Sequence, residues 1–419
     1  MSYNTKKKYT FIDLFAGCGG LTEGFLQTGR YEALAHIEWE MPMVDTLRHR
    51  LIQKWNHTEK EAKRRVICFD IQRTQELIYG NWSEQSKLEF GTDNDERVMS
   101  YGLKGVVGKE KVDLIIGGPP CQAYSIHGRA TDKNSMQDDY RNYLFESFCK
   151  VVEAFQPEVF VFENVRGLLS AKPGGKYVTE RIYETFKNIG YDIRSPKELN
   201  TALYDASDFQ VAQTRPRVII LGIKNDSSLN LNDLYASISS ERTLDKNRTV
   251  ADEIGDLPPL YPLEKPIRVG RVIHSHQYNP NPAITQHEAR NHSERERQIF
   301  YEWVANNMNH ISHQAMIDYY FQKTGHRTLY QKYKSLEWNK PAHTIVAHLS
   351  KDGYMFIHPD STQQRSITIR EAACLQSFPR DFEFIASTPY CYKMIGNAVP
   401  VRFAAGIAAG IYKVLDKNS

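Results

Sequence analysis

Apolar residues in the first half of the chain fall into short, nearly continuous runs. Seven such runs predict β-strands, the sixth of them more weakly than the others: residues 9–15, 32–39, 65–70, 112–118, 158–164, 191–200 and 217–223. Several are apolar at almost every position, as expected for strands that are covered on both faces. Between them, residues 141–155 place Leu144, Phe148 and Phe155 on one helical face. This alternation predicts an α/β fold with a doubly wound, mostly parallel, Rossmann-like sheet.

The pattern changes in three places. Residues 69–111 form a longer link than a simple crossover needs, and their polar middle predicts a surface excursion. After Lys224 the sequence becomes polar and irregular, and residues 261–340 interleave histidines with aromatic residues, so we place a second domain there. Near the end, residues 368–379 predict a short helix with Thr368 and Glu371 at capping-box spacing. A further helix follows with Pro400 in its first turn.

Composition adds little to this picture. The chain has 419 residues, of which 41% are hydrophobic and 25% charged, which is typical of a globular protein. The net charge of +3 does not indicate a nucleic-acid partner, so any basic surface must be local. We find no apolar run of roughly 18 residues and no apolar core of a secretory signal. Six scattered cysteines without a CxxC pair favour a reducing, cytoplasmic location.

Candidate chemistry begins at the ends of the first three predicted strands. In "DLFAGCGG", glycines follow the first strand and precede a helix, which permits a tight turn and a close ligand. Glu38 ends the second strand, where a carboxylate can accept hydrogen bonds from two ribose hydroxyls, and Trp39 can cover a flat ring. Asp70 ends the third strand and can accept a hydrogen bond from an adenine amino group. As an ordered set they predict an adenosine-containing cofactor, although either acid alone is better explained as a loop cap.

The stretch "IIGGPPCQAYS" places Cys121 at the end of a stiff arm. Two prolines fix φ and push the preceding residues toward extended geometry. The arm should therefore carry Cys121 from the strand end into the cleft as a nucleophile. The alternative, a small buried cysteine, fits a position after Pro-Pro poorly.

Two further strand ends supply polar partners for this cysteine. Glu163 ends the apolar run "VFVF" and can share a proton with a base nitrogen; the alternative is a helix cap. Arg215 and Arg217 in "QTRPR" precede the last strand and can hold a carbonyl oxygen or a phosphate. The alternative for these arginines is a solvated turn.

Together these motifs resemble the cytosine-C5 DNA methyltransferase family of the prokaryotic restriction-modification type. The resemblance covers nearly the whole chain, in the family's order: "DLFAGCGG", "IEW", "FDI", "GGPPCQAYS", "FENV", "QTRPR", a variable region, "REAACLQSFP" and "GNAVP". The combination of "PPCQ", "ENV" and "GNAVP" is highly specific, whereas each piece alone is weak.

The resemblance implies a mechanism on a flipped cytosine of duplex DNA. Cys121 attacks C6 as a thiolate, Glu163 contacts N3 and the exocyclic amine, and Arg217 holds the base carbonyl with Arg215 close by. Carbon-5 then takes a methyl group from S-adenosylmethionine, and S-adenosylhomocysteine is the product. The steps amount to nucleophilic catalysis and need no metal.

The resemblance also assigns supporting residues. The positions that match the family's cofactor contacts are Phe15, Gly17, Gly19, Gly20, Glu38, Trp39, Asp70, Ile71, Gly118, Pro119, Leu144, Asn397 and Val399. Asn164 resembles the residue that braces the Pro-Cys loop. Residues 122–139 match a mobile loop that closes over DNA, and His127 can either enter the space left by the base or be an ordinary loop residue.

The resemblance implies three regions. Residues 1–224 would be the catalytic and cofactor-binding domain, residues 225–391 a smaller, irregular target-recognition domain, and residues 392–419 a segment that returns to the first domain. The candidate DNA contacts in the second are Lys323, Arg327, Lys332, Lys334 and nearby tyrosines, with a generic solvated surface as an equal alternative. Histidines 274, 276, 287 and 292 lack accompanying cysteines, so we predict no zinc site.

We weigh three functions. The first is a DNA cytosine-C5 methyltransferase, the second an RNA (tRNA) methyltransferase on the same scaffold, and the third a non-catalytic DNA-binding relative. The substantial recognition region favours DNA, and intact Cys121 and Glu163 argue against a silent copy. We expect a bacterial, cytoplasmic, DNA-associated monomer, with a cognate restriction endonuclease as a candidate partner.

Overall fold

The computed structural model describes residues 8–120, 144–243 and 247–418. The chain divides into two compact units. Unit 1 comprises Met1–Gln210, Arg215–Leu244 and Ala398–Ser419, and unit 2 comprises Val211–Thr214 and Asp245–Asn397. Each unit is described by itself below.

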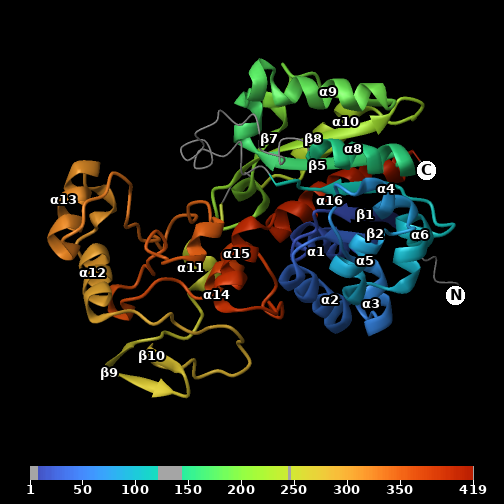
Figure 1. The fold of residues 1–419 in the computed structure, drawn as a ribbon. Coiled ribbons are helices and arrows are strands. Elements are labelled where there is room, and N and C mark those ends of the chain that lie inside the picture. The colour runs from blue at the N-terminus through green and yellow to red at the C-terminus, as the bar shows by residue number, and fades with distance from the viewer. Residues whose placement is uncertain (1–7, 121–143, 244–246, 419) are drawn as a thin grey trace, which may run out of the picture. The chain divides into compact units, whose positions relative to one another are not determined.

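Unit 1 is built on one eight-stranded sheet (Figure 1). Its strands are β1 (Tyr9–Leu14), β2 (Tyr31–Glu38), β3 (Val66–Cys68), β4 (Leu114–Gly117), β5 (Val159–Val165), β6 (Tyr191–Ile193), β7 (Leu203–Asp205) and β8 (Pro216–Lys224). The order is β3-β2-β1-β4-β5-β8-β6, with β7 also paired to β8. Strands β3, β2, β1, β4 and β5 are parallel, and β8 runs antiparallel to β5, β6 and β7. The predicted α/β class with a mostly parallel sheet is confirmed.

The strand register shows that both faces of this sheet are covered. Ile12 pairs with Ile115, which pairs with Phe160, so these three side chains share a face. Phe160 stacks on Phe186 of α9, whereas Phe11, on the opposite face, contacts Phe25 of α1. The sheet is therefore doubly wound, which explains why its central strands are apolar at nearly every position.

The helices of unit 1 form two contact series. α1 packs against α16 and α16 against α10, while α4 contacts α6 and α8, and α8 contacts α9. The helices are α1 (Gly20–Gln27), α2 (Met41–Trp55), α3 (Glu59–Arg65), α4 (Thr74–Tyr79), α5 (Glu84–Phe90), α6 (Glu96–Val107), α8 (Leu144–Phe155), α9 (Val178–Asn188), α10 (Leu231–Ser240) and α16 (Val401–Lys417). Short 3-10 helices are η1 (Gly91–Asp93), η4 (Arg166–Ser170), η5 (Pro173–Gly175), η6 (Leu199–Ala202) and η7 (Ala206–Phe209).

The link between β3 and β4 differs from the predicted surface excursion. Most of it is helical, in α4, α5, η1 and α6, and Trp82 and Leu103 are buried. Asn94, in the polar middle, is also buried; its side chain accepts from the backbone N–H of Cys68 and donates to its carbonyl. Its amide supports the end of β3, so the polar middle is part of the fold.

Unit 2 holds less regular structure. Its elements are α11 (Val250–Ile254), β9 (Pro262–Val269), β10 (Val272–His276), α12 (Glu294–Ala305), η8 (Met308–His310), α13 (His313–Thr324), η9 (Ala347–Ser350), η10 (Ser361–Gln363), α14 (Ile369–Leu375) and α15 (Thr388–Asn397). A small core gathers Ile299, Phe300 and Trp303 of α12 with Met316 of α13 and Tyr333. The predicted capping box of Thr368 and Glu371 is present at α14. Pro400 is the N-cap of α16 in unit 1 and does not lie in its first turn.

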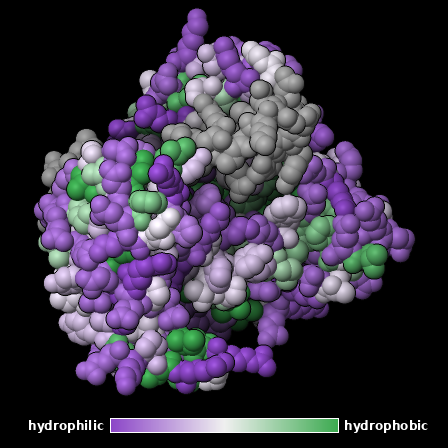
Figure 2. Space-filling view, turned by 60° about the vertical axis from the view of Figure 1, so that its left-hand side comes forward, coloured by the Kyte–Doolittle hydropathy of each residue, from purple (hydrophilic) through white to green (hydrophobic). Residues whose placement is uncertain are grey.

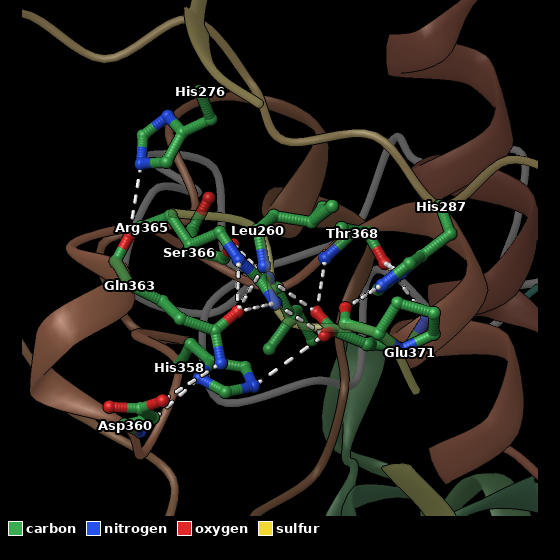
Figure 3. A network of polar contacts seen from close by, with 12 residues as sticks. Leu260, His276, His287, His358, Asp360, Gln363, Arg365, Ser366, Thr368 and Glu371 are labelled. Atoms are coloured by element: carbon green, nitrogen blue, oxygen red, sulfur yellow. Dashed lines mark hydrogen bonds and ion pairs between the residues drawn. The ribbon is translucent and has the colours of Figure 1, made fainter. Parts of the chain in front are cut away.

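A buried polar network joins the segments before α14 (Figure 3). Arg365 makes two hydrogen bonds to Glu371, each 2.7 Å long. Gln363 accepts from Arg365 and from the backbone N–H of Leu260. A charge pair this deeply buried requires such additional hydrogen bonds to offset its desolvation.

One segment of the described residues, Thr388–Lys417, is long and apolar enough to cross a membrane by length and composition alone. It consists of α15 and α16, and 67% of its apolar window is buried inside the protein, as in a core helix. This run is longer than the sequence analysis recognised. The face seen in Figure 2 is mostly hydrophilic, with apolar residues in small separate groups.

Candidate active site

The turn after β1 adopts a backbone conformation that places its N–H groups toward the end of β2. Phe15, Gly17 and Gly19 all have positive φ, at 59°, 56° and 93°. The N–H of Gly17 donates to Glu38 Oε2 at 2.9 Å. A Cβ on Gly20 would lie 2.4 Å from the carbonyl oxygen of Val399, so this position accepts only glycine. The structure thus brings the predicted glycine turn together with Glu38 and Val399.

The acidic residues at the ends of β2 and β3 hold the local backbone. Glu38 Oε1 accepts from the N–H groups of Trp39 and Glu40, at 2.8 and 2.9 Å. Burial raises the pKa of Glu38, while these backbone donors and that of Gly17 oppose the rise. Asp70 Oδ1 accepts from the N–H of Gln72 at 2.9 Å. Both acids therefore act as loop caps, and because a carboxylate has about four acceptor positions, each retains capacity for a ligand.

The geometry around this turn suits an adenosine-containing group. A Cβ on Gly17 would meet only Met43 Sδ, at 3.9 Å, which leaves the backbone open to close approach. Trp39 is 52% exposed directly after the buried Glu38 and offers a free ring face. Ile71 is buried beside Asp70. Open backbone, ring face and carboxylates are the features that such a ligand requires.

The arm after β4 is held against the end of β5. A Cβ on Gly118 would lie 2.8 Å from Glu163 Oε2, so the missing side chain lets the carboxylate approach the backbone. Asn164 donates its side-chain amide to the carbonyl of Pro119 at 3.3 Å, the bracing contact that the family resemblance implied. Cys121 and the loop of residues 122–139, including His127, lie outside the described residues.

Glu163 and Arg217 form an ion pair. Arg217 Nε lies 2.8 Å from Glu163 Oε1, and each side chain is 11% exposed. The pair forms because β8 runs antiparallel to β5 and places Arg217 opposite Val165. Arg215 is 2% exposed and donates to the carbonyl of Ala398 at 3.0 Å. Burial, reinforced by Arg217, lowers the pKa of Arg215. The two arginines thus differ in role: Arg217 faces the carboxylate and Arg215 braces the start of the returning segment.

A chain of buried polar side chains behind the glycine turn has no counterpart among the residues predicted from the sequence. Thr22 of α1 donates to Asp13 Oδ2 at 2.7 Å and lies 3.0 Å from His36 Nδ1. Burial raises the pKa of Asp13 to about 7, so this carboxyl group is close to half protonated at neutral pH. Burial lowers the pKa of His36 to about 3, so the imidazole is uncharged there. The one feature of the sequence that could have indicated this chain was Asp13, a carboxylate near the end of the otherwise largely apolar β1.

The remaining predicted residues lie in different elements of the chain. Leu144 is buried at the start of α8, and Asn397 is exposed and belongs to unit 2. In the described ranges, no three His, Cys, Asp or Glu side chains form a metal-binding group. Of the histidines considered for zinc, His276, His287 and His292 instead have hydrogen-bond partners within unit 2.

The candidate recognition residues also divide. Tyr333 is 2% exposed and lies in the core of unit 2, so it cannot meet a base. Lys323 is paired with Glu302 at 2.6 Å. Arg327 is stacked over Phe321 and Lys332 over Tyr320, at 5.5 and 5.7 Å from the ring centres. The prediction that the tyrosines near these basic residues contact DNA is therefore wrong for Tyr333.

Most of the chain matches a known family. The model of the family described as C-5 cytosine-specific DNA methylase matches residues 9–82 and 92–413. The chain belongs to the C-5 cytosine-specific DNA methylase family. It is a DNA cytosine-C5 methyltransferase, as the sequence motifs predicted.

Individual relatives support this assignment over nearly the full length. The Type II methyltransferase M.Bpa9945I of Bacillus paralicheniformis is 32% identical, over 97% of this chain and 99% of its own. M1.HphI of Haemophilus parahaemolyticus, also a Type II methyltransferase, is 29% identical over 97% of this chain and 87% of its own length. Among solved structures, a prophage-encoded DNA modification methyltransferase of E. coli has a TM-score of 0.60 at 22% identity, covering 98% of this chain and 100% of its own. That structure shares the fold of the methyltransferase described here.

Proposed function

We propose that this methyltransferase transfers a methyl group from S-adenosylmethionine to carbon-5 of a cytosine in a specific duplex DNA sequence, with Cys121 as its nucleophile. The observation that carries the proposal is the placement of Glu163. Its carboxylate lies against the backbone of Gly118, three residues before Cys121, and is paired with Arg217. A carboxylate and an arginine are thereby held together at the end of the strand that borders Gly118, and the chain continues from Gly118 to Cys121 in sequence.

Each residue has a defined task on a base that has been flipped from the duplex. The Cys121 thiolate forms a bond to C6, and the C5–C6 electron pair moves onto C5. Glu163 binds N3 and the exocyclic amine, and Arg217 holds the base carbonyl while it keeps Glu163 oriented. After C5 is methylated, loss of its proton restores the double bond and expels the Cys121 thiolate.

The cofactor would be held by the turn after β1 and the ends of β2 and β3. Glu38 would accept from ribose hydroxyls, Trp39 would cover the adenine ring, and Asp70 would accept from the adenine amine. S-adenosylmethionine supplies an electrophilic methyl group when bound. The other positions that match the family's cofactor contacts complete the proposed set: Phe15, Gly17, Gly19, Gly20, Ile71, Gly118, Pro119, Leu144, Asn397 and Val399.

We also propose how the protein reads and finds its target. Residues 225–391 would form the target-recognition domain, residues 1–224 the catalytic domain, and residues 392–419 the returning segment. The enzyme would act as a monomer on DNA in a bacterial cytoplasm, with a cognate restriction endonuclease. Relatives described as Type II methyltransferases support that setting.

The test uses labelled S-adenosylmethionine with genomic DNA or with tRNA, followed by bisulfite sequencing. We expect label in DNA at cytosines of one sequence, and we expect Cys121→Ser to abolish it. Calorimetric binding of S-adenosylmethionine by Cys121→Ser should match the wild type, which controls for folding. Label confined to tRNA would overturn the DNA substrate, and unimpaired turnover by Cys121→Ser would overturn the nucleophile.

A further inference from the structure

A short segment leaves the catalytic strand and carries exposed positive charge. β5 ends at Val165, and η4 and η5 connect it to α9 (Figure 1). Arg166 comes three residues after Glu163, and three extended residues span at most about 10 Å. DNA that delivers a base to Glu163 must therefore pass close to Arg166, where this segment begins.

Two cations in the segment have no anionic partner within the described part of the chain. Arg166 and Lys172 are both exposed, and neither forms an ion pair there. Their neighbours differ: Lys176 pairs with Glu184, and Arg181 donates to the carbonyl of Pro173 at 2.9 Å. Unpaired exposed cations beside a site for a polyanion are suited to bind phosphate.

The segment is ordered by the fold itself. Leu168, Ala171 and Val178 are each 1% exposed and anchor its two ends. The N–H of Val178 donates to the carbonyl of Ala171 at 3.0 Å, which closes residues 172–177 into a loop. Lys172 Nζ lies 4.0 Å from the centre of the Tyr177 ring, a cation–π contact that restrains the side chain. Little conformational entropy remains to be lost when an anion binds.

We propose that Arg166 and Lys172 bind phosphates of the substrate duplex beside the target cytosine. This assignment rests on the proposed role of Glu163 at the target base. Arg166 can engage a phosphate with two parallel N–H groups, whereas Lys172 acts as a point charge. Both contacts are independent of sequence, so they position DNA and do not select the site.

The test measures the salt dependence of binding to a fluorescent mixed-sequence duplex. Each phosphate contact adds about 0.9 to the slope of log K against log salt. Arg166→Ala/Lys172→Ala should therefore lower the slope by about 1.8. Between 50 and 200 mM salt the wild-type affinity should fall about 12-fold more than that of the double variant. With saturating genomic DNA, we expect kcat to stay close to that of the wild type while KM rises.

Lys104→Ala/Lys109→Ala provides a matched control. Both lysines are exposed, Lys104 also lies over a tyrosine ring (Tyr79, 5.2 Å), and both precede β4, at the amino ends of the parallel strands. We expect this control to keep the wild-type slope. An unchanged slope in Arg166→Ala/Lys172→Ala, or an equal loss in the control, would overturn the inference. Failure of the wild type to methylate cytosine would instead count against the proposed function, since the slope is measured without turnover.

Discussion

At the scale of single residues, unit 2 keeps histidines uncharged next to a buried ion pair. Burial lowers the pKa of His292 and His358 to about 3 and that of His276 to about 4, and nearby Arg365 adds to each effect. The backbone N–H of Ser366 donates to His292 Nε2, which requires that nitrogen to be unprotonated. Burial alone would raise the pKa of Glu371, but Arg365 and His358 outweigh it and hold that pKa well below its usual range.

These shifts predict that acid destabilises the folded protein. Between about pH 6.5 and pH 4 the unfolded histidines bind protons that the folded ones do not, so stability falls as the pH falls. Each such histidine contributes up to about 1.4 kcal/mol per pH unit. His292→Gln should flatten the decline of Tm over this range, as measured by scanning fluorimetry, with the exposed His313→Gln as the control. An equally steep decline in His292→Gln would contradict this reading.

The sequence predicted that the site residues lie at strand ends, but it did not predict which of them contact each other. Glu163 and Arg217 were expected to act separately on the base. Their ion pair depends on β8 running antiparallel to β5, and strand direction is a property of the tertiary fold. Asp13 went unassigned for a similar reason, because its partner Thr22 comes from a helix and Thr22 in turn contacts His36 of a neighbouring strand.

At the scale of elements, the contact between α1 and α16 depends on small residues. A Cβ on Gly24 would lie 2.5 Å from both the Cβ of Ala404 and the carbonyl oxygen of Val401. One turn earlier, Gly20 allows the same close approach to Val399. The two helices therefore touch through backbone, and the glycine turn of the candidate cofactor site begins at this contact.

Gly24→Ala tests this contact, because helix propensity predicts that the substitution stabilises the protein and packing predicts that it destabilises it. Propensity alone favours alanine by about 1 kcal/mol. Overpacking costs about 1–3 kcal/mol, so we expect a net loss of stability and weaker S-adenosylmethionine binding. Urea unfolding and calorimetry measure the two effects. Gly91→Ala is the control, because its Cβ would meet the flexible Met99 side chain at 3.3 Å and make an ordinary contact with Lys87 Cβ at 3.7 Å. A stabilised Gly24→Ala protein would disprove the packing argument.

Elements with strong patterns were predictable, and short ones were not. All seven predicted strands exist, although the strand expected within residues 191–200 covers only Tyr191–Ile193. β7 has three residues, β9 is largely exposed, and the buried residues of β10 are polar, so neither periodicity nor a run of apolar residues marked them. Residues 91–98 were predicted to lie on the surface because they are mostly polar, yet Val98 is buried, and so is Asn94, whose side chain is satisfied by backbone groups.

At the scale of the whole molecule, unit 1 is assembled from separated parts of the chain. Its sheet and most of its helices precede Asp245–Asn397, the main segment of unit 2, whereas α16 follows that segment. Unit 2 has its own core around Trp303 and its own polar network around Arg365. An inserted unit with an independent core can vary in sequence while unit 1 stays the same.

An exchange of residues 261–340 with those of a relative tests whether specificity lies in unit 2. We expect the chimera to methylate a different sequence, because these residues lie entirely in unit 2. S-adenosylmethionine affinity should remain at the wild-type level, as measured by calorimetry. Bisulfite sequencing reports the methylated site. An unchanged site would show that residues outside 261–340 determine the sequence specificity.

The position of α16 also has a consequence for biosynthesis. Phe403, Ile407 and Ile411 of this helix are fully buried in unit 1, yet the ribosome adds them only after unit 2 has been made. Throughout that interval the nascent chain lacks the helix that covers α1, and the apolar surface awaiting it remains a target for chaperones or aggregation. Methylation by this enzyme should therefore begin only after α16 has left the ribosome, however early the sheet forms.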